Sequence, residues 1–95
     1  MADGRTVHVV ITGRVQGVGY RAWLEAEAMG LELDGWVRNR RDGSVEAMLS
    51  GDPLIVAEML AACEEGPPAA VVEKVAVEDT RRGLANEGFR VLPTE

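Results

Sequence analysis

The stretch TVHVVITGRVQGVGYRAWL, residues Thr6–Leu24, changes its hydrophobic period halfway along its length. Its first part is rich in β-branched residues and alternates in polarity, which predicts a strand. From Tyr20, apolar residues instead recur every three or four positions to about Leu31, which predicts an amphipathic helix. A short glycine-rich segment joins the two. The strand face consists of Val7, Val9 and Ile11, and the helix stripe of Tyr20, Leu24, Ala28 and Leu31.

The next part of the chain predicts a β-hairpin followed by a second helix. Residues 34–51, DGWVRNRRDGSVEAMLSG, hold two candidate strands around Arg41–Ser44, whose Asp-Gly pair is typical of hairpin turns. Residues 53–65 then form the clearest helix in the sequence, because Asp52 can cap it and Pro53 suits its first position. An apolar stripe runs along this helix at Val56, Met59, Leu60 and Cys63.

Two further strands complete the predicted fold. Residues 70–80, AVVEKVAVEDT, form the fourth strand, and residues 88–93, GFRVLP, form a short fifth. This order predicts an α+β protein with the ferredoxin-like α/β sandwich, a βαββαβ unit plus a short C-terminal strand, in which two helices cover one face of an antiparallel sheet. With 95 residues, 46% of them hydrophobic, we expect one domain over residues 1–95, ordered over about 5–93.

Composition argues against several classes of protein. Cys63 is the only cysteine, so neither an internal disulfide nor a Cys-rich zinc site can form, and a reducing, cytoplasmic setting is expected. The first residues lack a signal-peptide pattern, and no apolar run is long enough to span a membrane. A net charge of −6 argues against binding to nucleic acids or anionic membranes, and a small acidic domain is expected to be a monomer.

Positive charge is concentrated in two short segments of this acidic chain. Arg14 and Arg21 flank the glycine-rich segment, and Arg38, Arg40 and Arg41 lie in the hairpin. If the two segments meet in space, they would form a local anion site suited to a small phosphate or carboxylate ligand. The hairpin arginines also fit a solvated surface.

The glycine-rich segment itself suits anion binding. Gly13, Gly17 and Gly19 can adopt positive φ and turn successive N–H groups toward one ligand, and the N-terminus of the following helix adds unpaired N–H groups. Arg21, in the first turn of that helix, could fork onto two phosphate oxygens. The same spacing also fits a plain tight turn beside a solvated arginine, so spacing alone leaves both interpretations open.

The complete residue sequences of two segments are more specific than the spacing of their glycines. GRVQGVGYR (residues 13–21) and GWVRNRRDGSVE (residues 35–46) resemble the two signatures of the acylphosphatase family, and residues 66–75 and 88–91 are similar to its C-terminal half. The resemblance implies the ferredoxin-like fold and hydrolysis of the carboxyl-phosphate bond of acyl phosphates, with no cofactor and no metal. The products would be a carboxylate and inorganic phosphate, and phosphate or a similar anion would be a competitive ligand.

The family's functional residues can be carried over by position. The resemblance makes Arg21 the phosphate-binding arginine and Asn39 the residue that orients the attacking water, so both are the expected catalytic residues. Tyr20 stands where phenylalanine is common, and Glu32 stands where a glycine often ends the helix, which leaves the helix end open. The loop expected to cradle the phosphate consists of Arg14, Val15, Gln16, Gly17, Val18, Gly19 and Tyr20, followed by Arg21.

Acyl-phosphate hydrolysis requires little acid–base apparatus. The leaving group is a carboxylate with a pKa near ~4–5, so it departs without a general acid. Catalysis then consists of holding the phosphoryl group, compensating its charge and placing water in line, and no covalent intermediate is expected. Because an amide is a poor base, we hypothesise that the substrate phosphate itself accepts the proton.

Three other classes of protein fit parts of the sequence. A non-catalytic module could bind phosphate on the same loop and turn nothing over. An RNA-binding ferredoxin-like domain would stack bases on aromatic residues of its sheet, whereas this chain is acidic and has only two Trp, one Tyr and one Phe. The same motifs can also form the N-terminal domain of larger carbamoyl-handling maturation proteins, but no metal-knuckle cysteines follow here, so a free-standing enzyme is expected.

Four conspicuous residues have simpler interpretations. His8, the only histidine, is interpreted as a structural or exposed residue of the first strand, and Cys63 as a small core residue. Trp23 and Trp36 are expected to pack in the core, where Trp36 could also brace the strand that carries Asn39.

Overall fold

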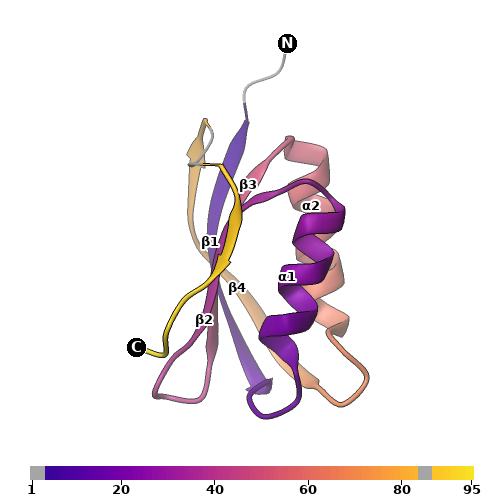
Figure 1. The fold of residues 1–95 in the computed structure, drawn as a ribbon, viewed down its shortest axis with the longest axis vertical. Helices are drawn as coiled ribbons and strands as arrows, with labels where there is room; N and C mark the ends of the chain where they lie inside the picture. Colours follow the sequence, from indigo (N-terminus) through magenta and orange to yellow (C-terminus); the bar gives the residue numbers. More distant parts are fainter. Residues whose placement is uncertain (1–3, 84–86) are drawn as a thin grey trace.

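In the computed structural model, which describes residues 4–83 and 87–95, two helices pack on one face of a five-stranded sheet (Figure 1). The expected α+β sandwich is therefore present, while residues 1–3 and 84–86 of the expected domain lie outside the described residues. In chain order the elements are β1 Arg5–Arg14, α1 Tyr20–Gly30, β2 Asp34–Asn39, β3 Val45–Gly51, α2 Pro53–Glu65, β4 Val71–Arg82 and β5 Phe89–Val91.

The strand order of the sheet is β4-β1-β3-β2-β5. The four longer strands pair antiparallel, as the sequence predicts, but β5 pairs parallel to β2. The sheet is thus mixed rather than wholly antiparallel. The reason is that β4 stops at the same end of the sheet, along the strand direction, as the end at which β2 begins. At that end the Gly83 amide donates to the Gly4 carbonyl, and the Gly35 amide donates to the Gly88 carbonyl. A strand that starts at that end has to run in the same direction as β2.

The core lies between the sheet and the two helices. Val7, Val9 and Ile11 of β1 are fully buried, which confirms the predicted inward face of that strand. Each such side chain contributes roughly 1.5–3 kcal/mol when removed from water. Both predicted helix stripes face this layer, and their fully buried members are Tyr20, Leu24 and Ala28 of α1 and Val56, Met59 and Cys63 of α2.

The two tryptophans lie on opposite faces of the sheet. Trp23 of α1 packs against the core, with its ring edge-on to that of Tyr20 at 5.2 Å between centroids, as expected. Trp36 does not, because side chains alternate along β2 and Val37 takes the inward position. Trp36 instead lies on the face without helices, where the guanidinium carbon of Arg38 is 4.9 Å from its ring centroid. The expectation of a core Trp36 was wrong.

The helix ends are defined by local backbone chemistry. The Asp52 carboxylate accepts a hydrogen bond from the Leu54 amide at 2.9 Å, so the predicted N-cap of α2 is confirmed. Helix α1 ends at Gly30, and Glu32 then adopts the left-handed region with φ 57°. The Leu33 amide closes this turn by donating to the Ala28 carbonyl. Glu32 therefore occupies the left-handed position that follows many helices and is usually taken by glycine.

None of the helices in the described ranges, 4–83 and 87–95, is long and apolar enough to cross a membrane.

Candidate active site

Residues 15–19 form the loop that joins β1 to α1. Gly17 and Gly19 have φ of 74° and 80°, as the sequence predicts, and an added Cβ at either would meet only open space. Their requirement for glycine is therefore conformational. Gly13 also has positive φ, but a Cβ there would collide with the carbonyl oxygen of Val71. Gly13 thus allows β1 and β4 to approach, while Gly17 and Gly19 shape the loop.

Side chains at both ends anchor this loop. The Gln16 amide nitrogen donates to the carbonyl oxygens of Arg40 and Ser44 at 2.7 and 2.8 Å, which ties the loop to the β2–β3 turn. The Tyr20 hydroxyl donates to the Cys63 carbonyl at 2.7 Å and so connects the loop to α2. Burial, with the neighbouring Cys63, raises the pKa of Tyr20 far above its ordinary value. Tyr20 therefore remains a neutral anchor.

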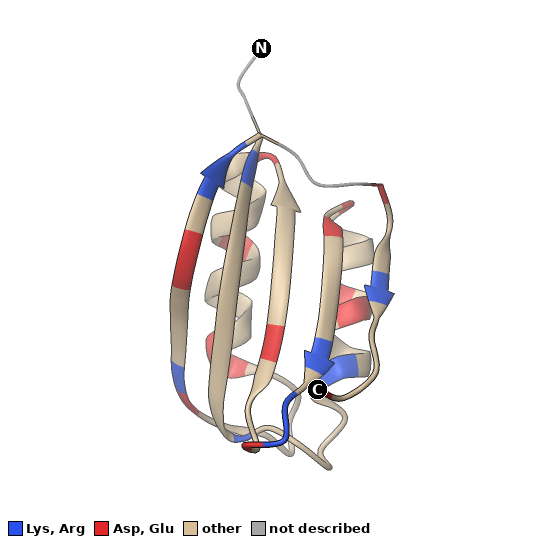
Figure 2. Ribbon diagram, turned by 90° about the vertical axis from the view of Figure 1, so that its left-hand side faces the viewer, with Lys and Arg blue, Asp and Glu red and all other residues tan. Residues whose placement is uncertain are grey.

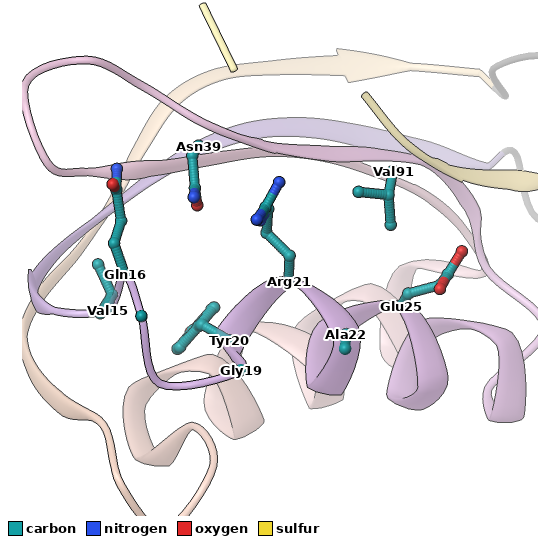
Figure 3. A pocket seen from close by; sticks show the side chains of 10 residues that line it. Val15, Gln16, Gly19, Tyr20, Arg21, Ala22, Glu25, Asn39 and Val91 are labelled. Carbon is teal, nitrogen blue, oxygen red and sulfur yellow. The ribbon is translucent and has the colours of Figure 1, made fainter. Parts of the chain in front are cut away.

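A cavity of about 320 Å³ opens between the loop, the start of α1 and the end of β2. Figure 3 shows Arg21, on the first turn of α1, and Asn39, the last residue of β2, extending into the same space. The resemblance named these two residues as catalytic, and the fold brings them together from positions 18 apart in sequence. The residues that line the cavity are Val15, Gln16, Gly17, Gly19, Tyr20, Arg21, Ala22, Glu25, Asn39 and Val91.

The amide oxygen of Asn39 is unusual. Within the described residues, it is the buried side-chain oxygen that lacks a hydrogen-bond partner. Leaving such an acceptor unsatisfied costs roughly 1–3 kcal/mol, so these atoms are rare in folded proteins and need an explanation. Because Asn39 lines the cavity, a donor that enters it could satisfy this oxygen.

Two groups at the same cavity can attract an anion. Arg21 is half-buried and makes no hydrogen bond or ion pair with the residues described, so its guanidinium is free for a ligand. Gly19 is the N-cap of α1 and has no side chain to cap the helix, and the Trp23 amide makes the first hydrogen bond of the helix, to the Gly19 carbonyl. The N–H groups before Trp23 therefore lack partners within the helix and present its positive dipole end.

Two residues of the expected phosphate loop lie outside the cavity lining. Arg14 is exposed at the end of β1, and Val18 packs against the core. Their backbone groups remain predicted contacts. Conversely, Ala22, Glu25 and Val91 line the cavity although sequence reasoning did not name them. Glu25 lies four residues after Arg21, and this helical spacing is a signal that places both on one face of α1.

The hairpin arginines separate into two groups. Arg40 lies in the turn that Gln16 holds against the loop, so the turn and the start of α1 lie at the same end of the molecule (Figure 2). Arg38 instead points to the face of the sheet without helices, where it binds Glu46 at 2.6 Å and Glu95 at 2.8 Å. The hairpin segment and the glycine-rich segment therefore meet at Arg40, whereas Arg38 lies away from the loop.

His8 belongs to the Arg38 cluster rather than to the cavity. Its Nε2 contacts the Glu46 carboxylate on the open face of the sheet, in agreement with a structural interpretation. Burial raises the pKa of Glu46, but hydrogen bonds from Arg38 and His8 outweigh burial and hold it below its ordinary value. Across the described part of the chain, no group of three or more His, Cys, Asp or Glu side chains could hold a metal ion.

The fold and the cavity define a small α+β protein with a glycine-rich loop at the N-terminus of a helix. Residues 7–91 match the sequence model of the acylphosphatase family, and the chain belongs to that family. It is 54% identical to the acylphosphatase of Bradyrhizobium diazoefficiens, over 93% of this chain and 94% of that protein. Against the acylphosphatase of Rhodopseudomonas palustris the identity is 58%, over 90% and 92% of the two chains.

Solved structures agree with this assignment. The crystal structure of acylphosphatase from Bacillus subtilis superposes with a TM-score of 0.87 at 32% sequence identity. The match covers 93% of this chain and 98% of the Bacillus chain. The two chains therefore share their overall architecture.

Proposed function

We propose that this protein is an acylphosphatase, which hydrolyses the carboxyl-phosphate bond of acyl phosphates to a carboxylate and inorganic phosphate. One observation carries the proposal: Asn39, whose buried amide oxygen is unpaired within the described residues, lines the same cavity as Arg21 and the loop of Gly17 and Gly19. Membership of the acylphosphatase family supports the same activity.

Binding of the phosphoryl group falls to the loop and Arg21. The planar guanidinium can donate two parallel hydrogen bonds to phosphoryl oxygens, and backbone N–H groups of residues 14–21 surround the remaining oxygens. Both kinds of donor compensate the charge of the group as it transfers. Gln16 and Tyr20 contribute by holding the loop in place through their contacts with the β2–β3 turn and with α2.

Asn39 positions the attacking water, which is the second requirement of the reaction. Its Oδ1 accepts a hydrogen bond from the water and directs a lone pair of the water oxygen at phosphorus. The new P–O bond forms as the bond between phosphorus and the carboxyl oxygen breaks, and the carboxylate leaves with the electron pair. The proton of the water passes to an oxygen of the substrate phosphate, so no side-chain base and no covalent intermediate are needed.

The proposal extends to the setting of the enzyme. We infer a single-domain monomer in the cytoplasm, since the one cysteine, Cys63, is a buried free thiol that requires no oxidising compartment. The acidic net charge disfavours nucleic acids and anionic membranes as partners. Light scattering on the purified chain tests the monomer, and a stable dimer would contradict it.

The test of the proposed function is the hydrolysis of benzoyl phosphate by the purified chain in excess chelator, with inorganic phosphate titrated as a competitor. We expect turnover, competitive inhibition by phosphate, and loss of turnover in Asn39→Ala with phosphate affinity retained. Phosphate binding without turnover by the wild type would contradict the proposal and identify a non-catalytic phosphate-binding module instead.

A further inference from the structure

The cavity extends beyond the groups that the proposed mechanism uses. Ala22 and Glu25 of α1 and Val91 of β5 line its other end (Figure 3). Glu25 is the acidic member of the lining and is half-buried. It makes no hydrogen bond or ion pair with any residue in the described ranges, so its carboxylate is available to a ligand.

In-line geometry decides which part of a substrate reaches this end. The leaving group has to lie on the side of phosphorus opposite the attacking water. In Figure 3, Asn39 and Gln16 lie on one side of Arg21, and Glu25 and Val91 lie on the other. A water held by Asn39 therefore directs the acyl group toward Glu25 and Val91.

The chemistry of this end is that of a small, partly apolar subsite with one negative charge. A volume of about 320 Å³ lies at the lower end of the ~300–1,000 Å³ range of ligand pockets, so a short acyl group fits beside the phosphoryl group. Ala22 and Val91 offer aliphatic surface to it. The Glu25 carboxylate repels a second negative charge, and its half-buried position weakens screening by solvent.

We propose that Glu25 determines the charge of the acyl group that the enzyme accepts. Acyl phosphates with an uncharged or cationic acyl group are preferred, and those with a second carboxylate, such as the monoacyl phosphates of dicarboxylic acids, are disfavoured. The inference rests on the proposed function, because it assigns the acyl end of the same cavity.

Butyryl phosphate and succinyl phosphate form a matched pair of probes, since both acyl groups contain four carbons and only the second carries a carboxylate. The quantity to measure is the ratio of their kcat/KM values. We expect the wild type to favour butyryl phosphate, and Glu25→Gln to reduce this preference by about tenfold at low ionic strength, mainly by improving the succinyl substrate. In Glu25→Lys the preference should reverse.

The matched control is Glu27→Gln. Glu27 lies on the same helix, is exposed and lies outside the cavity lining, and its substitution changes the net charge by the same amount. We expect Glu27→Gln to keep the wild-type ratio, and added salt to reduce the preference of the wild type.

Three results separate the possible failures. An unchanged ratio in both Glu25 variants would overturn the inference. An equal gain for both substrates in Glu25→Gln would also overturn it, because Glu25 would then act on the phosphoryl group. Absence of turnover with either substrate in the wild type would instead contradict the proposed function itself.

Discussion

Arg21 and Asn39 share one cavity, and we propose that they perform separable tasks. Arg21 presents a permanent positive charge, which would act on the phosphate in both the substrate and the product. Asn39 presents a neutral acceptor, which would act on water and add little to the affinity for phosphate. Substitutions at the two positions should therefore differ in what they remove.

Replacement of Arg21 by Ala should abolish turnover and phosphate inhibition together. We expect kcat/KM to fall by at least about 10²–10³-fold, because the main charged contact of the phosphoryl group is lost. Arg21→Lys should recover part of the phosphate affinity as a point charge but little of the rate, since the ammonium group cannot make the two parallel bonds. Phosphate affinity retained in Arg21→Ala would contradict the assignment.

Asn39→Ala should lose activity without losing stability. The wild-type side chain leaves a buried oxygen unpaired, and its removal eliminates that penalty of roughly 1–3 kcal/mol. We expect the free energy of unfolding in urea to equal or exceed that of the wild type. A loss of stability greater than about 2 kcal/mol would instead indicate that Asn39 is a structural residue.

At the scale of elements, the end of α1 and the β1–α1 loop show how local backbone conformation is encoded. The loop has glycine where left-handed backbone is needed, whereas the end of α1 has Glu32 in a similar conformation. A residue with a Cβ pays about 1–2 kcal/mol there. The helix end is therefore a strained position outside the site.

Glu32→Gly should stabilise the protein by about 1 kcal/mol, because glycine relieves this strain and suits the residue after a helix. Chemical denaturation measures the change, and kcat/KM should stay at the wild-type value. The control is Glu27→Gly in the exposed interior of the same helix, which should destabilise by roughly 1 kcal/mol. If both substitutions destabilise equally, the left-handed strain at Glu32 is refuted.

Sequence patterns predicted most elements because their signals are local. The stripe of α2, its Asp52 cap and the Asp-Gly turn each depend on a few neighbouring residues. The parallel pairing of β5 was not predictable, since it depends on which edge of the sheet the chain reaches after β4. For the same reason Val91 was not expected in the cavity, and the alternation that turns Trp36 outward was missed.

The candidate site was predictable from sequence only through the family resemblance. Spacing alone allowed an anion-binding loop near Arg21 but fitted a plain tight turn as well. Asn39 carries no local signal of its proposed role, which follows from its position at the end of β2, beside the loop and α1. The free acceptor at Oδ1 could be recognised only once the surrounding structure was known.

At the scale of the whole molecule, the two faces of the sheet have different roles. One face packs on the helices, and the cavity lies at one end of this face. The other face carries a charged cluster across the three central strands, β1, β3 and β2. Glu46 is only 7% exposed there and is bound by Arg38 and His8, while the exposed Glu95 shares Arg38. This cluster connects β1, β2 and β3, and its residues lie outside the cavity lining.

The cluster predicts a pH dependence of stability. Because the pKa of Glu46 is held below its ordinary value of 4.5 in the folded protein, its contribution is complete above that value and is lost as the pH falls through the lower folded pKa. We expect Glu46→Gln to lose about 1–3 kcal/mol near neutral pH and to show a smaller further loss in acid. Urea unfolding across pH 2–7 measures both.

Glu95→Gln is the control for this experiment, since it removes an exposed partner of the same arginine and should change stability by less than about 1 kcal/mol. Stability curves that run parallel for Glu46→Gln and the wild type throughout the acid range would refute the prediction.

The position of β5 has a consequence for biosynthesis. As the chain leaves a ribosome, the loop, Arg21 and Asn39 emerge in its first half, but β1 still lacks β4 as its neighbour and the cavity lacks the wall that Val91 provides. A nascent chain interrupted before that point holds Arg21 and Asn39 without the strand that completes the cavity around them. The onset of hydrolysis during translation would therefore mark the moment at which the last strand docks.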